Sequence, residues 1–411
     1  MPADLAVLGL GRPGLAAARA ATAASIDTVA FTPDPAAASA LNGGRPPSGS
    51  SLSAADLRRM LAAGFRASSD PAVLGRVRTA LICAPTPPGP GRAPELGAVR
   101  EAATALADRL RPRTLVVLES AVPPGTTEEV LRPLLERGSG LRAGRDFALA
   151  HAPARPAPAE RAAGRAAARV IGGLSSACTE AAAAFYGRLT DRVVRARGLA
   201  EAEAVTMLET NARHVAAALV NEMAVLCHEL GVDLWDVLRC AESRGLSPAR
   251  PGPGAEEEPV SPGGRLRLVE AAREINARMP RYVTMRAARL LNEHGKSARG
   301  AGILLLGVTS EPDLPDLPDL PGDQGAPARE IASRLLALGA RVSFHDPLLP
   351  GWRVSGRPVP RADALHEAAA EADLTLLLTA HGTYDLQGLA AKAQLLLDCR
   401  GATPAGAAHR L

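Results

Sequence analysis

Short apolar runs alternate with alanine-rich helical stretches through the first 195 residues, and this rhythm limits the fold more than any other feature. Three of the runs end at a glycine, proline or serine: LAVLGLG (5–11), TALICAPTP (79–87) and TLVVLES (114–120). Short runs that are apolar throughout are typical of parallel strands buried on both faces, which need helical crossovers between them. The pattern therefore predicts an α/β fold with a doubly wound sheet.

The rhythm stops near residue 200 and resumes near residue 300. Between 200 and 242, apolar residues recur every three or four positions, which predicts a long helix, a break at Gly231 and a second helix from about Asp233. Further helix is expected after PGPG (251–254). Four later runs predict a second Rossmann-like sheet: GAGILLLGV (300–308), ARVSFHDP (340–347), ADLTLLLTAH (372–381) and AQLLLDCRG (393–401).

We therefore expect two Rossmann-like doubly wound domains, at 1–195 and 299–411, joined by a central long-helix segment at 196–298. The threefold DLP repeat within 311–327 is low-complexity, and we expect it to form an extended, solvent-exposed loop.

Charge and cysteine usage exclude several classes of protein. The net charge is +4 and no block of lysine and arginine appears, so we expect no nucleic-acid partner. No apolar stretch of about 18 residues and no secretory leader are visible, so we expect no membrane contact. The five cysteines are scattered without metal-binding spacing, which favours a reducing cytoplasm. We expect Cys83, Cys227 and Cys240 to be ordinary buried cysteines.

The stretch GLGRPG follows the first predicted strand and opens a helix, which is the context of a dinucleotide fingerprint. Gly9 would allow the tight turn, Gly11 would let the backbone approach a pyrophosphate, and Gly14 would allow close packing of helix and strand. The motif predicts NAD as a cofactor. A glycine-rich turn without a ligand is the alternative.

The end of the second predicted strand departs from this fingerprint. An NAD site of this kind uses an acidic residue there to bind the ribose hydroxyls. The chain has Phe31 and Thr32 at that point, and Asp34 comes two residues late. Because a charge-assisted hydrogen bond contributes about 1.5–3 kcal/mol, we expect Thr32 to bind the ribose more weakly, about ten- to hundredfold.

Ordered motifs along the whole chain resemble the nucleotide-sugar 6-dehydrogenases of the UDP-glucose/GDP-mannose dehydrogenase family. The motifs are GLGRPG, CAPTP (83–87), LESAVPPGTT (118–127), APARPAP (152–158), RVIGG (169–173), MLETNARHVAAALVNEMAVLCHELGVD (207–233), PGPG, EINARMPRYV (274–283), LLLGV (304–308) and HDP (345–347).

The resemblance implies an NAD-binding domain, a central segment for dimerisation and the substrate loop, and a UDP-binding domain. It implies that a UDP-sugar is oxidised at C6 to the acid by two NAD, through a cysteine-bound intermediate. It adds Pro85, Thr86 and Ser120 to the cofactor-binding residues. It also places Arg155, Gly252 and Gly254 at the nucleotide sugar.

The residues that carry the family's chemistry are replaced here. The Gly-Gly-His-Cys that follows PGPG is missing, and a shorter AEEE (255–258) stands there instead. The other replaced positions are Ala121 for threonine, Ala154 for glutamate, Thr206 for lysine, Thr210 for asparagine and Ser261 for aspartate. In the last domain the family's Tyr-Lys-Pro-Asp is replaced by Ser310-Glu311-Pro312-Asp313.

Two functions stay open on these residues. The first is a non-catalytic or diverged paralogue that forms a homodimer, or a hetero-oligomer with an active paralogue, and in which a nucleotide sugar remains a candidate ligand. The acidic run at 256–258 would repel an anionic ligand, unless it faces water. The second is an active NAD-dependent oxidoreductase with a cysteine-free mechanism, for which His151 is the candidate base. A structural role for His151 is the alternative.

Overall fold

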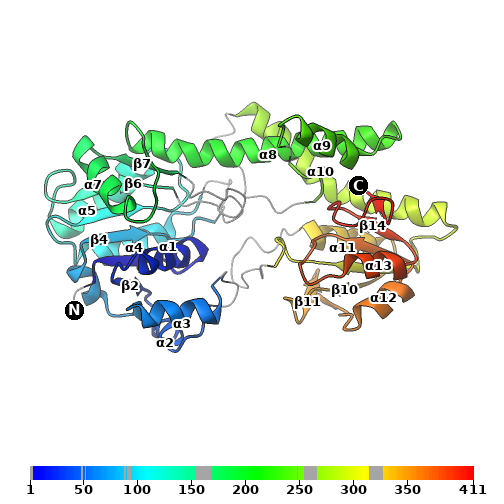
Figure 1. Cartoon of the computed structure of the whole chain (residues 1–411), viewed down its shortest axis with the longest axis horizontal. Helices are drawn as coiled ribbons and strands as arrows, with labels where there is room; N and C mark the ends of the chain where they lie inside the picture. The colour runs from blue at the N-terminus through cyan, green and yellow to red at the C-terminus, as the bar shows by residue number, and fades with distance from the viewer. Residues whose placement is uncertain are drawn as a thin grey trace. The chain divides into compact units, whose positions relative to one another are not determined.

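The computed structural model describes residues 3–47, 50, 52–87, 89, 94–153, 168–247, 249–253, 266–313 and 327–411. Its contacts divide the chain into two compact units, Met1–Glu209 and Thr210–Leu411. The boundary falls inside the long helix α8 (Leu199–Glu229), drawn in green in Figure 1. The three-domain boundaries stay a prediction, and most of the DLP repeat lies outside the described residues.

The described part of the first unit contains an eight-stranded sheet in the order β3-β2-β1-β4-β5-β6-β7-β8. The first six positions repeat the Rossmann order, and every neighbouring pair is parallel except β6 with β7. The four strands expected from the sequence here are β1, β2, β4 and β5. The strands are β1 (Leu5–Leu8), β2 (Thr28–Phe31), β3 (Arg66–Ser68), β4 (Thr79–Ile82), β5 (Leu115–Leu118), β6 (Ala148–His151), β7 (Arg169–Gly173) and β8 (Val193–Arg195).

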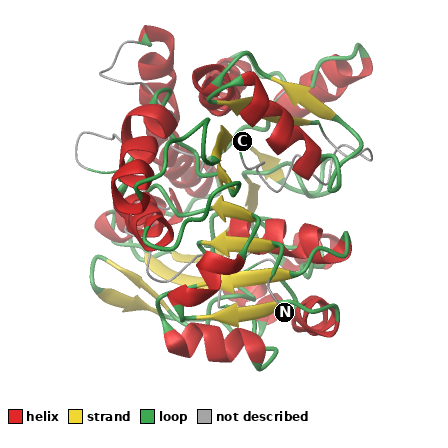
Figure 2. Ribbon diagram, turned by 90° about the vertical axis from the view of Figure 1, so that its left-hand side faces the viewer, coloured by secondary structure: helices red, strands yellow, loops and turns green. Residues whose placement is uncertain are grey.

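Helices cover both faces of this sheet, as Figure 2 shows for the strands drawn in yellow. One apolar cluster joins the sheet to α1, α2, α3 and α7, and another joins the opposite face to α4 and α5. Alanine supplies many of these contacts, which lets helices pack closely in a chain with only 2% aromatic residues. The α-helices are α1 (Arg12–Ala23), α2 (Pro35–Asn42), α3 (Ala54–Ala62), α4 (Gly97–Ala107), α5 (Arg132–Ser139) and α7 (Ser176–Tyr186), with the 3₁₀-helix η1 (Pro71–Arg76) and the π-helix η3 (Thr127–Leu131).

The described part of the second unit contains a fully parallel sheet in the order β10-β9-β13-β14-β15. This is the second common doubly wound order, so the expected pair of Rossmann-like folds is confirmed. A two-stranded antiparallel ribbon, β11 with β12, accompanies it. The strands are β9 (Gly302–Leu306), β10 (Arg341–His345), β11 (Trp352–Val354), β12 (Arg357–Val359), β13 (Leu374–Leu377), β14 (Leu396–Asp398) and β15 (His409–Arg410).

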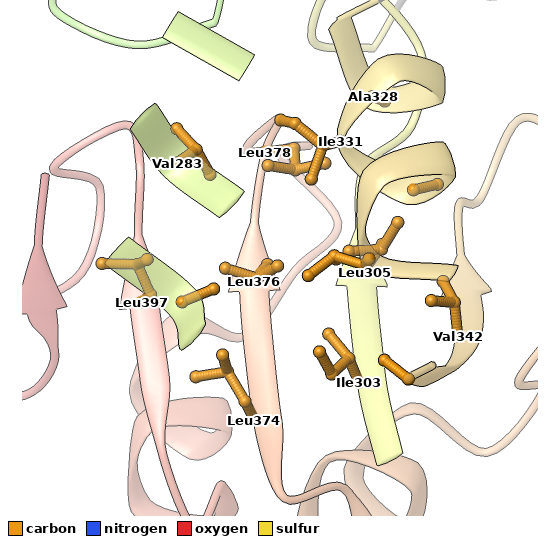
Figure 3. Packing of buried hydrophobic residues seen from close by; sticks show 14 of the residues in the cluster. Val283, Ile303, Leu305, Ala328, Ile331, Val342, Leu374, Leu376, Leu378 and Leu397 are labelled. Atoms are coloured by element: carbon orange, nitrogen blue, oxygen red, sulfur yellow. The ribbon is translucent and has the colours of Figure 1, made fainter. Parts of the chain in front are cut away.

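The core of the second unit lies between this sheet and two helices, α10 (Arg267–Glu293) and α11 (Pro327–Ala337). Figure 3 shows Val283 of α10 and Ile331 of α11 above the leucines and isoleucine of β9 and β13. Full burial of each such side chain contributes roughly 1.5–3 kcal/mol. Helices α12 (Leu365–Glu371) and α13 (Leu386–Lys392) cover the other face.

Helix α8 ends as the sequence predicts, and α9 (Leu234–Ser243) follows it. Gly231 has φ +68° and stops the helix, while Asp233 accepts hydrogen bonds from the amides of Trp235 and Asp236 and starts the next one. One expectation for this region is wrong. Cys240 is exposed, because it faces outward on α9, whereas Cys83 and Cys227 are buried as expected.

Within the described residues, no helix combines the length and the apolar character needed to span a membrane. The same residues contain no cluster of three or more histidine, cysteine, aspartate or glutamate side chains suited to a metal ion.

Candidate cofactor and substrate site

The turn from β1 into α1 has the shape that a dinucleotide pyrophosphate needs. Gly9 has φ +101°, and a Cβ there would lie 2.6 Å from the backbone oxygen of Cys83. A Cβ on Gly14 would lie 1.9 Å from the oxygen of Gly9, so neither glycine can be replaced without moving backbone. Gly11 differs, because Pro13 Cδ, at 3.8 Å, is the only atom of the described residues within 4 Å of its Cβ position, apart from its chain neighbours. Gly11 therefore borders open space at the start of a helix.

This helix start can accept an anion. Gly11 is the N-cap of α1, and none of the described side chains caps the helix there. Unpaired amides and the helix dipole at such an end favour a phosphate. The residues present at the turn thus fit the pyrophosphate of NAD. When bound, NAD would accept a hydride at its nicotinamide ring.

The ribose end of the cradle lacks a carboxylate. Strand β2 ends at Phe31, and Thr32 Oγ1 accepts a hydrogen bond from the Asp34 amide at 3.3 Å. The Asp34 carboxylate accepts from the Ala36 amide at 2.8 Å and caps α2. Asp34 is thus engaged at its own helix. The weaker NAD binding expected from Thr32 stays a prediction.

Two loops that follow β4 and β5 lie against each other at the carboxyl edge of the sheet. Thr86 Oγ1 donates a hydrogen bond to the oxygen of Ala121 at 2.8 Å, and Ser120 Oγ donates to the oxygen of Ala84 at 2.7 Å. The structure therefore brings Thr86, Ser120 and Ala121 together, with Pro85 between the two contacts. We call these four residues the cofactor rim.

A buried charge cluster lies beside the rim, and the motif comparison did not identify it as a site. Glu119 is 2% exposed and accepts hydrogen bonds from the Arg169 guanidinium and the Tyr186 hydroxyl. The Cys83 thiol lies 3.5 Å from the same carboxylate. Burial, followed by the Glu119 charge, raises the pKa of Cys83 well above its usual value, so this thiol stays protonated. The sequence offered one indication of this cluster, because Glu119 is a charged residue that directly follows the apolar strand β5.

His151 lies at the end of β6 and is fully buried. Burial, together with the nearby Arg169 charge, lowers its pKa to about 3. Neither ring nitrogen has a hydrogen-bond partner among the described residues. A neutral imidazole with so low a pKa is a poor proton acceptor at neutral pH, which argues against the role of base.

Thr206 and Thr210, which the resemblance singled out as replaced positions, lie one turn apart on α8. Thr206 is half-buried, and its hydroxyl has no partner within the described part of the chain. Thr210 is 5% exposed and its hydroxyl accepts from Arg213 at 3.3 Å. Neither side chain can carry a charge.

The start of the substrate loop is held firmly within the second unit. Gly252 has φ +130°, and a Cβ there would lie 2.7 Å from the oxygen of Cys399. Its amide donates to Asn221 Oδ1 at 2.9 Å, and Asn221 donates in turn to Asn276. Arg400 donates to the oxygen of Pro253 at 2.8 Å. The predicted residues Ala154, Arg155, Gly254 and Ser261, and the acidic run 256–258, lie outside the described residues.

Comparison with known proteins agrees with this geometry. Three sequence profiles of the UDP-glucose/GDP-mannose dehydrogenase family match the chain in order: the NAD binding domain over 3–190, the central domain over 200–293 and the UDP binding domain over 304–405. The chain belongs to the UDP-glucose/GDP-mannose dehydrogenase family. The family supports NAD as the dinucleotide for the cradle at Gly9–Gly14.

Curated relatives and solved structures lie within the same family. UDP-N-acetyl-D-mannosamine dehydrogenase of Pyrococcus horikoshii is 29% identical over 317 residues, which cover 73% of this chain and 71% of the relative. UDP-N-acetyl-D-glucosamine 6-dehydrogenase of Pseudomonas aeruginosa is 28% identical over 323 residues, or 74% and 71% of the two chains. A structure of UDP-D-ManNAc dehydrogenase from Pyrococcus horikoshii superimposes with a TM-score of 0.81 at 26% identity, covering 98% of this chain and 97% of the other.

Proposed function

We propose that this chain is a nucleotide-sugar dehydrogenase family member that keeps a weakened NAD cradle but does not catalyse the two-step oxidation of a UDP-sugar. The absence of a cysteine from the loop after PGPG carries the proposal. No cysteine occurs between Cys240 and Cys399, so this loop contains none. Cys399 adjoins the Gly252 turn through its backbone oxygen, and burial raises the pKa of its thiol to about 12. A thiol of that pKa is not a nucleophile at neutral pH.

The remaining positions offer no replacement chemistry among the described residues. Ala121, Thr206 and Thr210 carry no ionisable group. The low pKa of His151 disfavours the alternative of a cysteine-free oxidation, since hydride transfer from an alcohol needs a base for its proton. What supports the proposal is therefore the loss of nucleophile and base together.

The test measures turnover on the purified full chain. NAD would be incubated with UDP-glucose or with a UDP-N-acetylhexosamine, the class named for the relatives, and the NADH absorbance band would be followed. We expect no NADH above the rate without protein. Steady NADH formation with either sugar nucleotide contradicts the non-catalytic reading and favours the cysteine-free enzyme.

Restoring the ribose carboxylate should tighten NAD binding. The Thr32→Asp variant supplies the charged acceptor that the end of β2 lacks, and we expect the Kd for NAD to fall about ten- to hundredfold. Thr32→Asn is the matched control, because it has nearly the same shape without the charge. Calorimetric titration of the wild type and both variants gives the result. Equal affinity of the two variants would contradict the proposed geometry of the ribose end.

We further propose that a second copy of this chain covers an apolar groove between α8 and α10 of the second unit. The groove has a volume of about 720 Å³ and includes Leu219, Leu226, Tyr282 and Met285 in its lining. Three of these side chains are strongly exposed: Leu219 at 61%, Leu226 at 46% and Met285 at 58%. Exposed apolar side chains gathered in one place mark an interface.

Charge supports a pairing of identical surfaces. The α8 wall carries Glu222 and Glu229, whereas the α10 wall carries Arg278 and Arg281. A two-fold axis sets the same surface against itself, so an acidic wall can meet the basic wall of the other copy. The same complementarity would admit an active paralogue with a similar groove.

Leu226→Glu should therefore shift the chain from dimer to monomer in sedimentation velocity, because the carboxylate would be buried without a partner. The matched control is Leu336→Glu, which places the same charge on α11 at an apolar residue that is 41% exposed. We expect the control to leave the dimer intact. A wild-type chain that is monomeric at all concentrations would refute the second-copy proposal.

A further inference from the structure

Glu203 is a buried carboxylate on the second turn of α8 that the family comparison does not assign. It is 0% exposed, and its neighbours on that face of the helix, Leu199 and Ala202, are buried as well. Burial raises the pKa of Glu203, while hydrogen bonds from Thr127 and Gly125 act in the opposite direction. A carboxylate is retained in such a place when several donors satisfy it.

Three donors from the segment that follows β5 satisfy this carboxylate. The Gly125 amide donates to Glu203 Oε2 at 2.5 Å, and the Thr127 amide and hydroxyl donate to Oε1 at 2.7 Å and 2.6 Å. Gly125 has φ +95°, a conformation that glycine adopts readily. The loop backbone is thus shaped so that both amides converge on one side chain, 76 to 78 residues away along the chain.

The other end of this loop belongs to the cofactor rim. Ser120 and Ala121 open the loop, and each is hydrogen-bonded to the loop that follows β4. The 120–127 loop is therefore tied at one end to the residues expected to contact NAD and at the other end to Glu203. One helical turn beyond Glu203 lies Thr206, a position that the family uses for chemistry.

We propose that Glu203 is a positioning residue that holds the 120–127 loop on α8 and thereby sets the affinity of the cofactor rim for NAD. The inference rests on the proposed NAD binding for its cofactor part. The alternative is a helix-end contact that stabilises the fold without any influence on the rim.

The variant Glu203→Gln distinguishes the positioning role from a purely stabilising contact, and it changes the shape of the side chain very little. One amide oxygen can still accept from Thr127, but the NH₂ group then faces an amide donor instead of accepting from it. We expect hydrogen exchange at the Gly125 or Thr127 amide to accelerate at least tenfold, and the Kd for NAD to rise at least tenfold. Glu129→Gln is the matched control, because Glu129 lies in the same turn and is exposed. It should change neither quantity.

A second pair of variants keeps the test independent of any folding defect. Thr127→Val removes one hydroxyl donor and should weaken NAD binding severalfold. Thr127→Ser restores the hydroxyl and should restore the affinity, which a purely packing role would not predict.

Each further outcome counts against a defined part of the inference. Unchanged exchange at both amides in Glu203→Gln overturns the claim that Glu203 holds the loop. Faster exchange with unchanged NAD affinity, in Glu203→Gln and Thr127→Val alike, reduces Glu203 to a stabilising contact and overturns the positioning role. If the wild-type chain binds no NAD, both the proposed function and the influence of Glu203 on NAD affinity are contradicted. The exchange rates of the Gly125 and Thr127 amides still decide whether Glu203 holds the loop.

Discussion

Replacing Gly14 by alanine is expected to unfold the first unit, whereas replacing Gly11 by alanine is expected to leave it folded and to weaken NAD binding at least tenfold. The Cβ of Gly14→Ala would lie 1.9 Å from the Gly9 oxygen, which is backbone and cannot rotate away. Forcing β1 and α1 apart should destabilise the unit by more than about 4 kcal/mol. Gly11 has φ −68°, which alanine adopts without strain.

The two substitutions are chemically identical, so the comparison isolates their positions. Gly11→Ala should change the free energy of unfolding by no more than about 1 kcal/mol, because the restriction that alanine places on the unfolded chain opposes its poorer fit at the N-cap of α1. Its methyl group would nevertheless occupy the space where a pyrophosphate approaches, so we expect the Kd for NAD to rise at least tenfold. Chemical unfolding followed by circular dichroism and calorimetric titration measure the two effects. Retained NAD affinity in Gly11→Ala would show that the cradle is not used.

Truncating Arg169 should be the second large effect. The variant Arg169→Ala leaves the Glu119 carboxylate at 2% exposure without its cation, and such a change destabilises proteins by about 3–5 kcal/mol. Burial opposes the charge of Arg169, yet the ion pair with Glu119 and the contact with Tyr186 raise its pKa, so the guanidinium stays protonated.

An exposed ion pair in the same unit provides the control. Arg195 and Glu180 lie 2.7 Å apart, but their side chains are 50% and 62% exposed. Arg195→Ala should therefore lower the denaturant midpoint far less than Arg169→Ala does. The double variant Glu119→Gln with Arg169→Met should recover part of the loss, because it removes both charges together. If Arg169→Ala and Arg195→Ala unfold at the same denaturant concentration, the buried cluster is not a stabilising element.

Much of the fold follows from local patterns in the chain. Short apolar runs are the strands β1, β2, β4, β5, β9, β10, β13 and β14, and the glycine at 231 with aspartate at 233 ends one helix and begins the next. Strands β3, β8, β11, β12 and β15 were not predicted, because each has at most three residues. Strands β6 and β7 were not predicted, because alanine in the first and glycine in the second are depleted in strands. A strand of this kind is stabilised by its neighbours rather than by its own composition.

The sequence by itself determined the family, the order of the predicted elements and the lack of a cysteine between Cys240 and Cys399. Those properties are local, since they depend on which residue stands at which place in a motif. The tertiary structure alone decided that Glu119 meets Arg169, that Glu203 meets the 120–127 loop, and that Gly252 is held by Asn221. It also left Cys240 exposed, together with the α8 residues Leu208, Leu219 and Leu226. These contacts join residues that are 31 to 78 positions apart in the chain. The sequence could not predict them, because the period of a helix or strand indicates which face a residue occupies but not which distant element covers that face.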